Sequence, residues 1–335
     1  MAIRATAPTR IDLAGGTLDI HPLSVFVDGG LTLNMSTSLA SHVTIEPRAD
    51  AEIHLRSEDT GASLSAANVA SLPVGKELDL VARVVKFYAP KTGVNVTTRN
   101  TVPHGSGLGA SSSLLIALTG ALDRLNGTHL TPEQYVDWGA NIEAQCIGIP
   151  TGKQDYFAAL HGGVSAIWFR VDGNERQPLV TDEDFLRVLE ASVILTFTGE
   201  SRFSGTSNWN MLKAYIENSG NNRVCMHAIK RTALEMQEAL ARRDLMRFAE
   251  LLAQEWRNRK QLAEGVSTPR IERLMAAAAG AGARSSKICG AGGGGCMITA
   301  APQDKRQAVI AALEAGGAKH LEYRISRQGL TVEGD

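Results

Sequence analysis

Residues 103–113 of this 335-residue chain read PHGSGLGASSS, with glycine at alternate positions and a run of hydroxyl side chains after them. Because glycine has no Cβ atom, successive backbone N–H groups can turn toward one point, and an anion can approach them closely. Apolar residues at helical spacing follow over residues 110–125. The start of a helix supplies unpaired N–H groups and a positive dipole end. The segment therefore predicts a phosphate-binding loop that leads into a helix.

The predicted phosphate contacts come from this loop and from the hydroxyl groups that follow it. Ser111 and Ser112 stand where a hydroxyl can reach a phosphate oxygen or a bound Mg²⁺. The expected nucleotide-binding residues are Pro103, Gly105, Ser106, Gly107, Leu108, Gly109, Ala110, Ser111 and Ser112. An ordinary glycine turn with a serine cap on the helix remains the structural alternative.

Two known phosphate-binding motifs come close to the sequence without fitting it. Residues 105–110 match the dinucleotide pattern GxGxxG/A, but Asp123, the next candidate for the ribose-binding acid, falls inside the same predicted helix. The segment GIPTGK at residues 148–153 resembles a P-loop. However, three residues instead of four separate its glycines, and Gln154 stands where serine or threonine is required. The sequence therefore predicts neither a dinucleotide-binding motif nor a P-loop.

The predicted secondary structure mixes strands and helices without regular β–α–β alternation, which favours an α+β fold. Strands are expected at residues 41–47, 51–56, 94–98, 164–169, 193–197, 286–289, 296–300 and 322–325. Helices are expected at residues 79–88, 110–125, 208–218, 224–241, 244–262, 269–279 and 305–314. The sequence TPEQ at residues 131–134 has the form of a capping box that begins one further helix, and Asn126-Gly127 is a C-cap for the helix before it.

The length of the chain favours two domains. A polar segment at residues 172–184 separates two apolar, strand-like runs, and the region after it is rich in predicted helices. We place the boundary in this segment, which gives an N-terminal domain at residues 1–180 and a C-terminal domain at residues 181–335.

Composition and charge narrow the class of protein. The formal net charge is −1, so no basic excess points to nucleic acid or to a membrane surface. The first residues lack the apolar core of a signal peptide, and no run approaches the roughly 20 apolar residues of a membrane span. The four cysteines lack metal-ligand spacing and are expected to be reduced thiols. We expect a cytoplasmic protein with a small-molecule partner; whether it forms a homodimer is left open.

Three segments in a fixed order resemble the three motifs of the GHMP kinases, the galacto-, homoserine, mevalonate and phosphomevalonate kinases. APTRIDLAGGTLDI at residues 7–20 resembles the first motif, residues 103–113 resemble the second, and KICGAGGGGCM at residues 287–297 resembles the third. Within this superfamily, GKQDYFAALHGG at residues 152–163 and FTGESRFS at residues 197–204 are most similar to D-glycero-D-manno-heptose 7-phosphate kinases.

The resemblance implies a fold and an activity. It implies an N-terminal domain like ribosomal protein S5 domain 2 and a ferredoxin-like C-terminal domain, with the active site between them. It also implies an ATP- and Mg²⁺-dependent kinase that phosphorylates a sugar hydroxyl, O1 of a heptose 7-phosphate. Three departures from the family pattern are Ala110, His104 and the pair Thr17-Leu18. Because that pair lies at the sugar pocket, it bears on substrate identity more than on chemistry.

Phosphoryl transfer requires positioning, charge neutralisation and a group that takes the hydroxyl proton. Asp155 resembles the catalytic aspartate of the family and is the expected base. Arg10 lies among apolar or small neighbours, where an unpaired charge is costly. We assign it to the γ-phosphate and to pairing with Asp155, with Lys153 sharing the role. Glu143 resembles the Mg²⁺-binding glutamate and would act with Ser111 or Ser112.

The sugar site is expected around the first and third motifs. Asp19 resembles the sugar-binding aspartate, and Gly16 is assigned to the same pocket. The glycine-rich third motif should allow close approach to a neighbouring loop or to the substrate, through Gly292 and Gly293. If the sugar carries a second phosphate, a cation must anchor it. Arg202 and His21 are the candidates.

Two alternatives to a heptose-phosphate kinase remain. The first is a GHMP kinase for another hexose or for a small alcohol, and the second is a GHMP-like sensor that binds sugar and nucleotide without catalysis. The combination of Arg10, Glu143 and Asp155 argues against the sensor, because a protein without turnover has no need of a base.

Overall fold

Two β-sheets organise the chain, whose structure, a computed structural model, describes residues 1–201 and 204–334, with residues 204–207 described by their backbone alone. The larger sheet has the order β12-β1-β2-β5-β3-β4, and β6 pairs with β2 and with β7. Its strands are β1 (Ile3–Ala14), β2 (Gly30–Pro47), β3 (Ile53–Ser57), β4 (Ser63–Ala66), β5 (Val94–Asn100), β6 (Val164–Arg170), β7 (Gly173–Val180) and β12 (Thr331–Glu333). The pairings are antiparallel except between β3 and β5.

Strand β2 connects the two ends of this sheet. Its first part, residues 30–35, pairs with β6, and its last part, residues 41–47, pairs with β5. Residues 30–37 are all buried, so both faces of the strand are covered there. A strand buried on both faces has no reason to alternate apolar and polar residues. This explains why the sequence pattern predicted only residues 41–47 as a strand.

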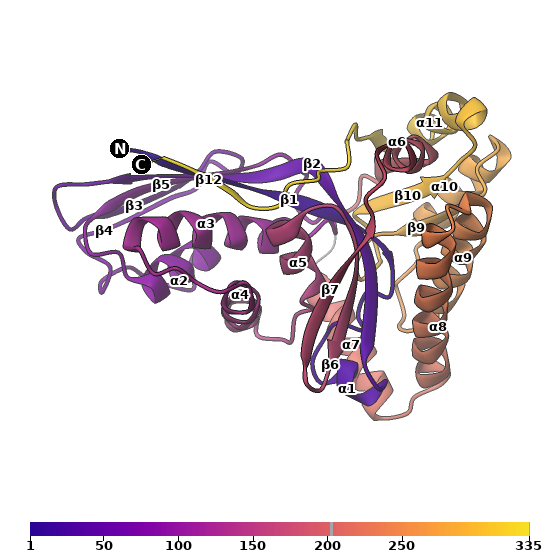
Figure 1. The fold of residues 1–335 in the computed structure, drawn as a ribbon, viewed down its shortest axis with the longest axis horizontal. Coiled ribbons are helices and arrows are strands. Elements are labelled where there is room, and N and C mark those ends of the chain that lie inside the picture. Colours follow the sequence, from indigo (N-terminus) through magenta and orange to yellow (C-terminus); the bar gives the residue numbers. More distant parts are fainter. Residues whose placement is uncertain (202–203, 335) are drawn as a thin grey trace.

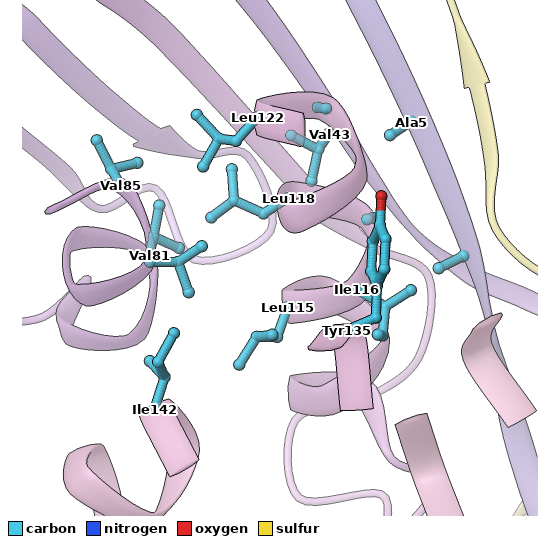
Figure 2. Close-up of a cluster of buried hydrophobic side chains, with 14 of the residues drawn as sticks. Ala5, Val43, Val81, Val85, Leu115, Ile116, Leu118, Leu122, Tyr135 and Ile142 are labelled. Carbon is cyan, nitrogen blue, oxygen red and sulfur yellow. The ribbon is translucent and has the colours of Figure 1, made fainter. Parts of the chain in front are cut away.

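Helices cover one face of the larger sheet (Figure 1). They are α2 (Asp79–Tyr88), α3 (Ala110–Asn126), α4 (Pro132–Ile147) and α5 (Gln154–His161), while the short α1 (Leu23–Phe26) lies between β1 and β2 in the chain. Figure 2 shows the core of this layer, where Leu115, Leu118 and Leu122 of α3 lie among Val81 and Val85 of α2 and side chains of the sheet. The apolar face of α3 thus fixes the position of the loop that precedes it.

The smaller sheet lies in the second half of the chain, in the order β11-β8-β10-β9. Its strands are β8 (Val193–Phe197), β9 (Ser285–Ile288), β10 (Cys296–Ala300) and β11 (Lys319–His320). The helices around it are α6 (Glu183–Ser192), α7 (Ser204–Ile216), α8 (Asn222–Ala241), α9 (Leu245–Arg259), α10 (Pro269–Gly280) and α11 (Arg306–Ala315), the last preceded by a 3₁₀ turn at Gln303–Lys305. Ile11 and Leu33 of the larger sheet share one apolar cluster with Leu251 of α9 and Ile298 of β10. The two halves therefore pack through a common core.

The C-terminal tail returns to the larger sheet (Figure 1). After β11 the backbone N–H of Gly163 donates to Ser326 O at 2.7 Å, and that of Leu330 donates to Leu160 O at 3.2 Å. The chain then ends in β12, which pairs with β1. The boundary at residue 180 stays a proposal, and the last residues belong spatially with the first half.

Most predicted elements are present, and the α+β class is confirmed. Thr131 and Gln134 form the predicted capping box, and Gly127 caps α3 in the left-handed conformation. None of the helices in the described part of the chain combines the length and apolarity needed to cross a membrane.

The predicted strand at residues 322–325 is wrong. Only an isolated bridge joins Ile325 to Thr37. The Ile325 N–H donates to the Glu190 carboxylate at 2.7 Å, and the Arg324 N–H donates to Ser38 Oγ at 3.0 Å. Side chains satisfy backbone donors that a strand would have paired with a neighbouring backbone.

Candidate active site

A cavity of about 520 Å³ lies between the two halves of the chain. Arg10, Asp19, Glu143 and Asp155 line it from the first half, together with most of residues 103–112. The described part of the second half contributes Ser201, Asn208, Gly290 and Ala291. The segments that resemble the three GHMP motifs, residues 7–20, 103–113 and 287–297, thus meet at one site.

Residues 103–109, here called the phosphate loop, end directly at the N-terminus of α3. Gly105, Gly107 and Gly109 have φ angles of +67°, +71° and +72°, which residues with side chains adopt only with strain. Gly109 occupies the cap position, and no side chain caps the first turn of the helix. The unpaired N–H groups of this turn are therefore available to an anion.

The glycine-rich third motif packs against this loop by direct backbone contact. A Cβ atom on Gly107 would lie 2.8 Å from Cys289 O, and one on Gly295 would lie 2.7 Å from Ser106 O. The Cys296 N–H donates to Ser106 O at 2.6 Å. Residues 289–295, here called the glycine loop, thus need glycine in order to approach the phosphate loop closely. They are not a flexible linker.

Arg10 and Asp155 form an ion pair beside the phosphate loop. Asp155 Oδ1 accepts from Arg10 Nε at 2.7 Å and lies 2.6 Å from Arg10 Nη2. Arg10 Nη1 donates to Gly107 O at 2.6 Å, so the guanidinium also fixes the loop. Asp155 lies in the first turn of α5, and Gly109 is so near that a Cβ atom there would meet its carboxylate at 2.7 Å.

Burial governs the protonation of Asp155. It raises the pKa of Asp155 above the ordinary value, while the Arg10 guanidinium opposes the increase. A carboxylate with a raised pKa is a stronger base than a solvated one, and the arrangement suits it to accept a proton from a bound hydroxyl group.

Glu143 lies at the other side of the α3 N-terminus and is surrounded by hydroxyl groups. Ser111 Oγ donates to Oε1 at 2.5 Å, and Ser112 donates to Oε2 at 3.2 Å. Thr151 and the Tyr156 hydroxyl also donate to Oε2. Burial raises the pKa of Glu143, and these donors act in the opposite direction. One carboxylate beside two serine hydroxyls fits Mg²⁺, which prefers hard oxygen ligands and keeps several waters or phosphate oxygens.

Asp19 lies in the turn that follows β1 and is buried. Its Oδ2 accepts from the Gln154 N–H at 2.9 Å, and a Cβ atom on Gly152 would lie 2.1 Å from the same oxygen. Burial raises the pKa of Asp19 to about 6. The carboxylate therefore changes charge near neutral pH.

Several predicted residues lie elsewhere. The Lys153 ammonium pairs with Asp137 of α4 at 2.6 Å, although it was expected to share the role of Arg10. Gly292 and Gly293 pack against Val266, and Gly290 and Ala291 line the cavity in their place. The remaining predicted residues fall outside the lining: Leu108 is in the core, Gly16 is buried behind the cavity, and His21 is exposed at the surface. Arg202 lies outside the described residues.

No sequence pattern indicated one wall of the cavity. It comes from separate elements of the first half and includes Asp59, Leu78, Val81 and Asn100. Gln154 was also missed beside Asp19, whereas Thr17, which the family resemblance placed at the sugar pocket, lines the cavity. The wall residues carry no motif, because they are brought together only by the pairing of β3 with β5 and the packing of α2.

Comparisons with known proteins agree with this geometry. The family model described as GHMP kinases N terminal domain matches residues 79–163, and the one described as GHMP kinases C terminal matches residues 236–319. A D-glycero-alpha-D-manno-heptose 7-phosphate kinase from Campylobacter jejuni is 31% identical, over 98% of each chain. A mevalonate kinase from Thermococcus sibiricus is 31% identical over 72% of this chain and 69% of its own. Among solved structures, a D-glycero-D-manno-heptose 1-phosphate kinase from Bacteroides thetaiotaomicron superposes with a TM-score of 0.80, at 27% identity over 99% of both chains.

Proposed function

The chain belongs to the GHMP kinase family, and from this premise we propose that it transfers the γ-phosphate of ATP to a hydroxyl group of a sugar. It has the family's two-domain fold and is a phosphotransferase. The observation that carries the proposal is the convergence of the phosphate loop, the Arg10–Asp155 pair and the Glu143–serine group on one cavity.

The phosphate loop and the first turn of α3 would hold the phosphates of ATP. The left-handed glycines and the uncapped helix start leave N–H groups and space for an anion. Glu143, Ser111 and Ser112 would hold Mg²⁺ beside them. When bound there, the metal ion would neutralise charge on the β- and γ-phosphates.

Asp155 would act as the general base. It accepts the proton of the sugar hydroxyl while that oxygen bonds to the γ-phosphorus and the bond from this phosphorus to the bridging oxygen breaks. Arg10 holds the Asp155 carboxylate by two contacts and offers positive charge to the group in transfer. The products are a phosphorylated sugar and ADP.

The sugar would lie in the part of the cavity lined by Thr17, Asp19 and Ile20, here called the acceptor side. Asp19 would accept hydrogen bonds from sugar hydroxyls. We propose O1 of a heptose 7-phosphate as the acceptor atom. The full-length similarity to a heptose 7-phosphate kinase supports this choice over the shorter match to mevalonate kinases.

A coupled assay of ADP release tests the proposal with D-glycero-D-manno-heptose 7-phosphate, unphosphorylated heptose, galactose and mevalonate, each with Mg²⁺ and with EDTA. We expect turnover to be fastest with the heptose phosphate and to be lost in EDTA. Phosphorus NMR of the product should then show a phosphate on the anomeric oxygen. Preference for another acceptor would replace the substrate assignment. Absence of turnover with every acceptor, despite measurable ATP binding, would favour the sensor.

A further inference from the structure

Four charged side chains behind the acceptor side are completely buried and form one ionic cluster. Asp12 Oδ2 of β1 lies 3.0 Å from Lys287 Nζ of β9, which lies 3.4 Å from Glu255 Oε2 of α9. Arg259, at the end of α9, completes the cluster through Glu255 Oε1 at 2.5 Å. These four residues, here called the buried ion cluster, join the larger sheet to the second half of the chain.

Stability alone does not explain this cluster. Charges lose their hydration when they are buried, and apolar residues of similar volume often leave a protein equally stable or more stable. Within the described part of the chain, Asp12 Oδ1 also lacks a hydrogen-bond donor. A buried acceptor without a donor lowers stability further. The contacts that the cluster makes with its surroundings point to another role.

Arg259 extends from the cluster to two segments that reach the cavity. Its Nη2 donates to Gly16 O at 2.8 Å, and its Nη1 donates to Thr17 Oγ1 at 3.3 Å. Nη1 also lies 3.5 Å from Gly290 O in the glycine loop. The planar guanidinium presents its N–H groups in a fixed fork, so it can hold several acceptors in a defined relative position. Glu255 in turn holds the guanidinium by Nε and Nη2.

The turn that Arg259 holds is strained and carries part of the acceptor side. Thr17 has a φ angle of +79°, which is unfavourable for a β-branched residue. Such a conformation persists only when its surroundings impose it. Thr17 lines the cavity, and Asp19 follows it two residues later. Fixing residues 16 and 17 therefore fixes the start of the acceptor side.

We propose that Arg259, oriented by the buried ion cluster, is a positioning residue for the acceptor sugar. It acts through Thr17 and the turn at residues 15–20 and does not itself line the cavity. This inference rests on the proposed function for its kinetic consequence. Acceptor binding should depend on Arg259 more than ATP binding does. Of the three contacts only the longest, to Gly290, adjoins the phosphate loop.

The kinetic test is Arg259→Lys, which keeps the charge of the cluster and removes the fork. We expect the KM for the acceptor to increase about tenfold, the loss of one strong contact, with the KM for ATP changed less than about twofold. Arg247→Lys is the matched control, because Arg247 lies on the same helix and forms exposed ion pairs with Glu235 and Glu250. The control should leave both constants unchanged. Equal changes of both KM values in Arg259→Lys would overturn the positioning role.

A double-mutant cycle isolates the contact with Thr17. Thr17→Val keeps the branched shape and removes the hydroxyl that accepts from Arg259. If the two residues act through this contact, Arg259→Lys should add little to the acceptor KM of Thr17→Val. Fully additive effects would contradict the proposal.

Amide hydrogen exchange of the free protein tests the same inference without any turnover. In Arg259→Lys we expect faster exchange at residues 15–20 and 289–295 than in the wild type, with no change at residues 79–88. If Arg259→Lys does not fold, Thr17→Val, which leaves all four charges in place, should still accelerate exchange at residues 15–20. Unchanged exchange there would refute the positioning role, even for an active kinase. A wild type without kinase activity would refute the proposed function and leave this measurement valid.

Discussion

Asp155 is held between two opposing influences on its charge. Its burial favours the protonated form, and the Arg10 guanidinium, 2.6 Å from Oδ1, favours the carboxylate. A side chain balanced in this way can accept a proton during the reaction and release it afterwards. Arg10 is fixed in turn by Gly107 O, so the position of the base depends on the phosphate loop.

Asp155→Asn should therefore bind ATP normally and reduce kcat by about 10²–10⁴. The amide keeps the size of the side chain and cannot accept the hydroxyl proton. Asp137→Asn is the control, because Asp137 pairs with Lys153, the residue before α5, outside the cavity lining, and should leave kcat unchanged. Steady-state ADP release and calorimetric ATP titration would measure the two effects. Near-normal turnover of Asp155→Asn would remove this residue from the role of base.

Asp19 predicts a pH dependence of sugar binding. Its pKa is about 6 in the folded protein, against an ordinary value of about 3.9, so between these values the folded state keeps a proton that the unfolded chain has released. The contribution of Asp19 to the free energy of unfolding is fully present below about pH 4 and is lost as the pH rises through about 6. Sugar binding should have the opposite dependence, because the carboxylate is the stronger acceptor of hydroxyl hydrogen bonds.

We expect the affinity for the acceptor to decrease by about tenfold per pH unit below pH 6. Calorimetric titration without ATP, from pH 5 to pH 8, measures binding apart from the proton transfer to Asp155. Asp19→Asn should bind weakly with no transition near pH 6. The same transition in both proteins would assign the titration to another group.

At the scale of single residues, the sequence predicted which residues line the site but not the directions of all their side chains. The motifs brought Arg10, Glu143 and Asp155 to one cavity as expected. Lys153 is two residues from Asp155, yet it pairs with Asp137, because positions two residues apart at the start of a helix point in different directions. No motif indicated the buried ion cluster. Glu255 and Arg259 lie one turn apart on α9, but Asp12 and Lys287 come from two other segments, and the three segments meet only through tertiary packing.

The phosphate loop and the glycine loop form the central contact between elements of the site. Their backbones meet at Gly107 and Cys289 and again at Ser106 and Gly295. From its sequence, the third motif could approach either the substrate or a neighbouring loop. In the structure it packs against the phosphate loop, and a one-dimensional pattern could not reveal this pairing.

Gly107→Val should disrupt this contact. The new Cβ atom would lie 2.8 Å from Cys289 O at a φ angle of +71°, so both loops must move. We expect the KM for ATP to increase about tenfold or more, with a loss of stability of about 1–2 kcal/mol from the left-handed backbone alone.

Gly127→Ala is the control at the opposite end of α3. It has a φ angle of +64° with open space around it, and it should lose similar stability without any change in the KM for ATP. An unchanged KM for ATP in a folded Gly107→Val would refute the contact's role in nucleotide binding.

At the scale of the whole molecule, the C-terminal tail connects the smaller sheet to the larger sheet and contacts the helices next to the site. The tail leaves the smaller sheet at β11, passes the end of α5 and pairs with β1 through β12. Leu330 packs on Gly120 of α3, so the tail contacts both helices that carry candidate catalytic groups at their N-termini. The sequence predicted a strand in the tail at the wrong place, because the partners of this segment, Ser38 and Glu190, lie 286 and 135 residues earlier in the chain.

Gly329→Ala should show how far this tail supports the site. A Cβ atom there would lie 2.1 Å from Leu160 O and 2.4 Å from the His161 nitrogen, and both are backbone atoms that cannot rotate away. Since Gly329 is not held at a positive φ, the whole effect comes from this clash at the end of α5. We expect a loss of about 1–3 kcal/mol in the free energy of unfolding, measured with urea, and a decrease in kcat as α5 and Asp155 shift.

Gly280→Ala is the matched control, because this glycine also lacks a positive φ and has nothing within 4 Å of a new Cβ atom. It ends α10, where alanine should be neutral or slightly stabilising. A stability loss in Gly329→Ala with unchanged kcat would mean that the tail supports the fold without setting the position of the base.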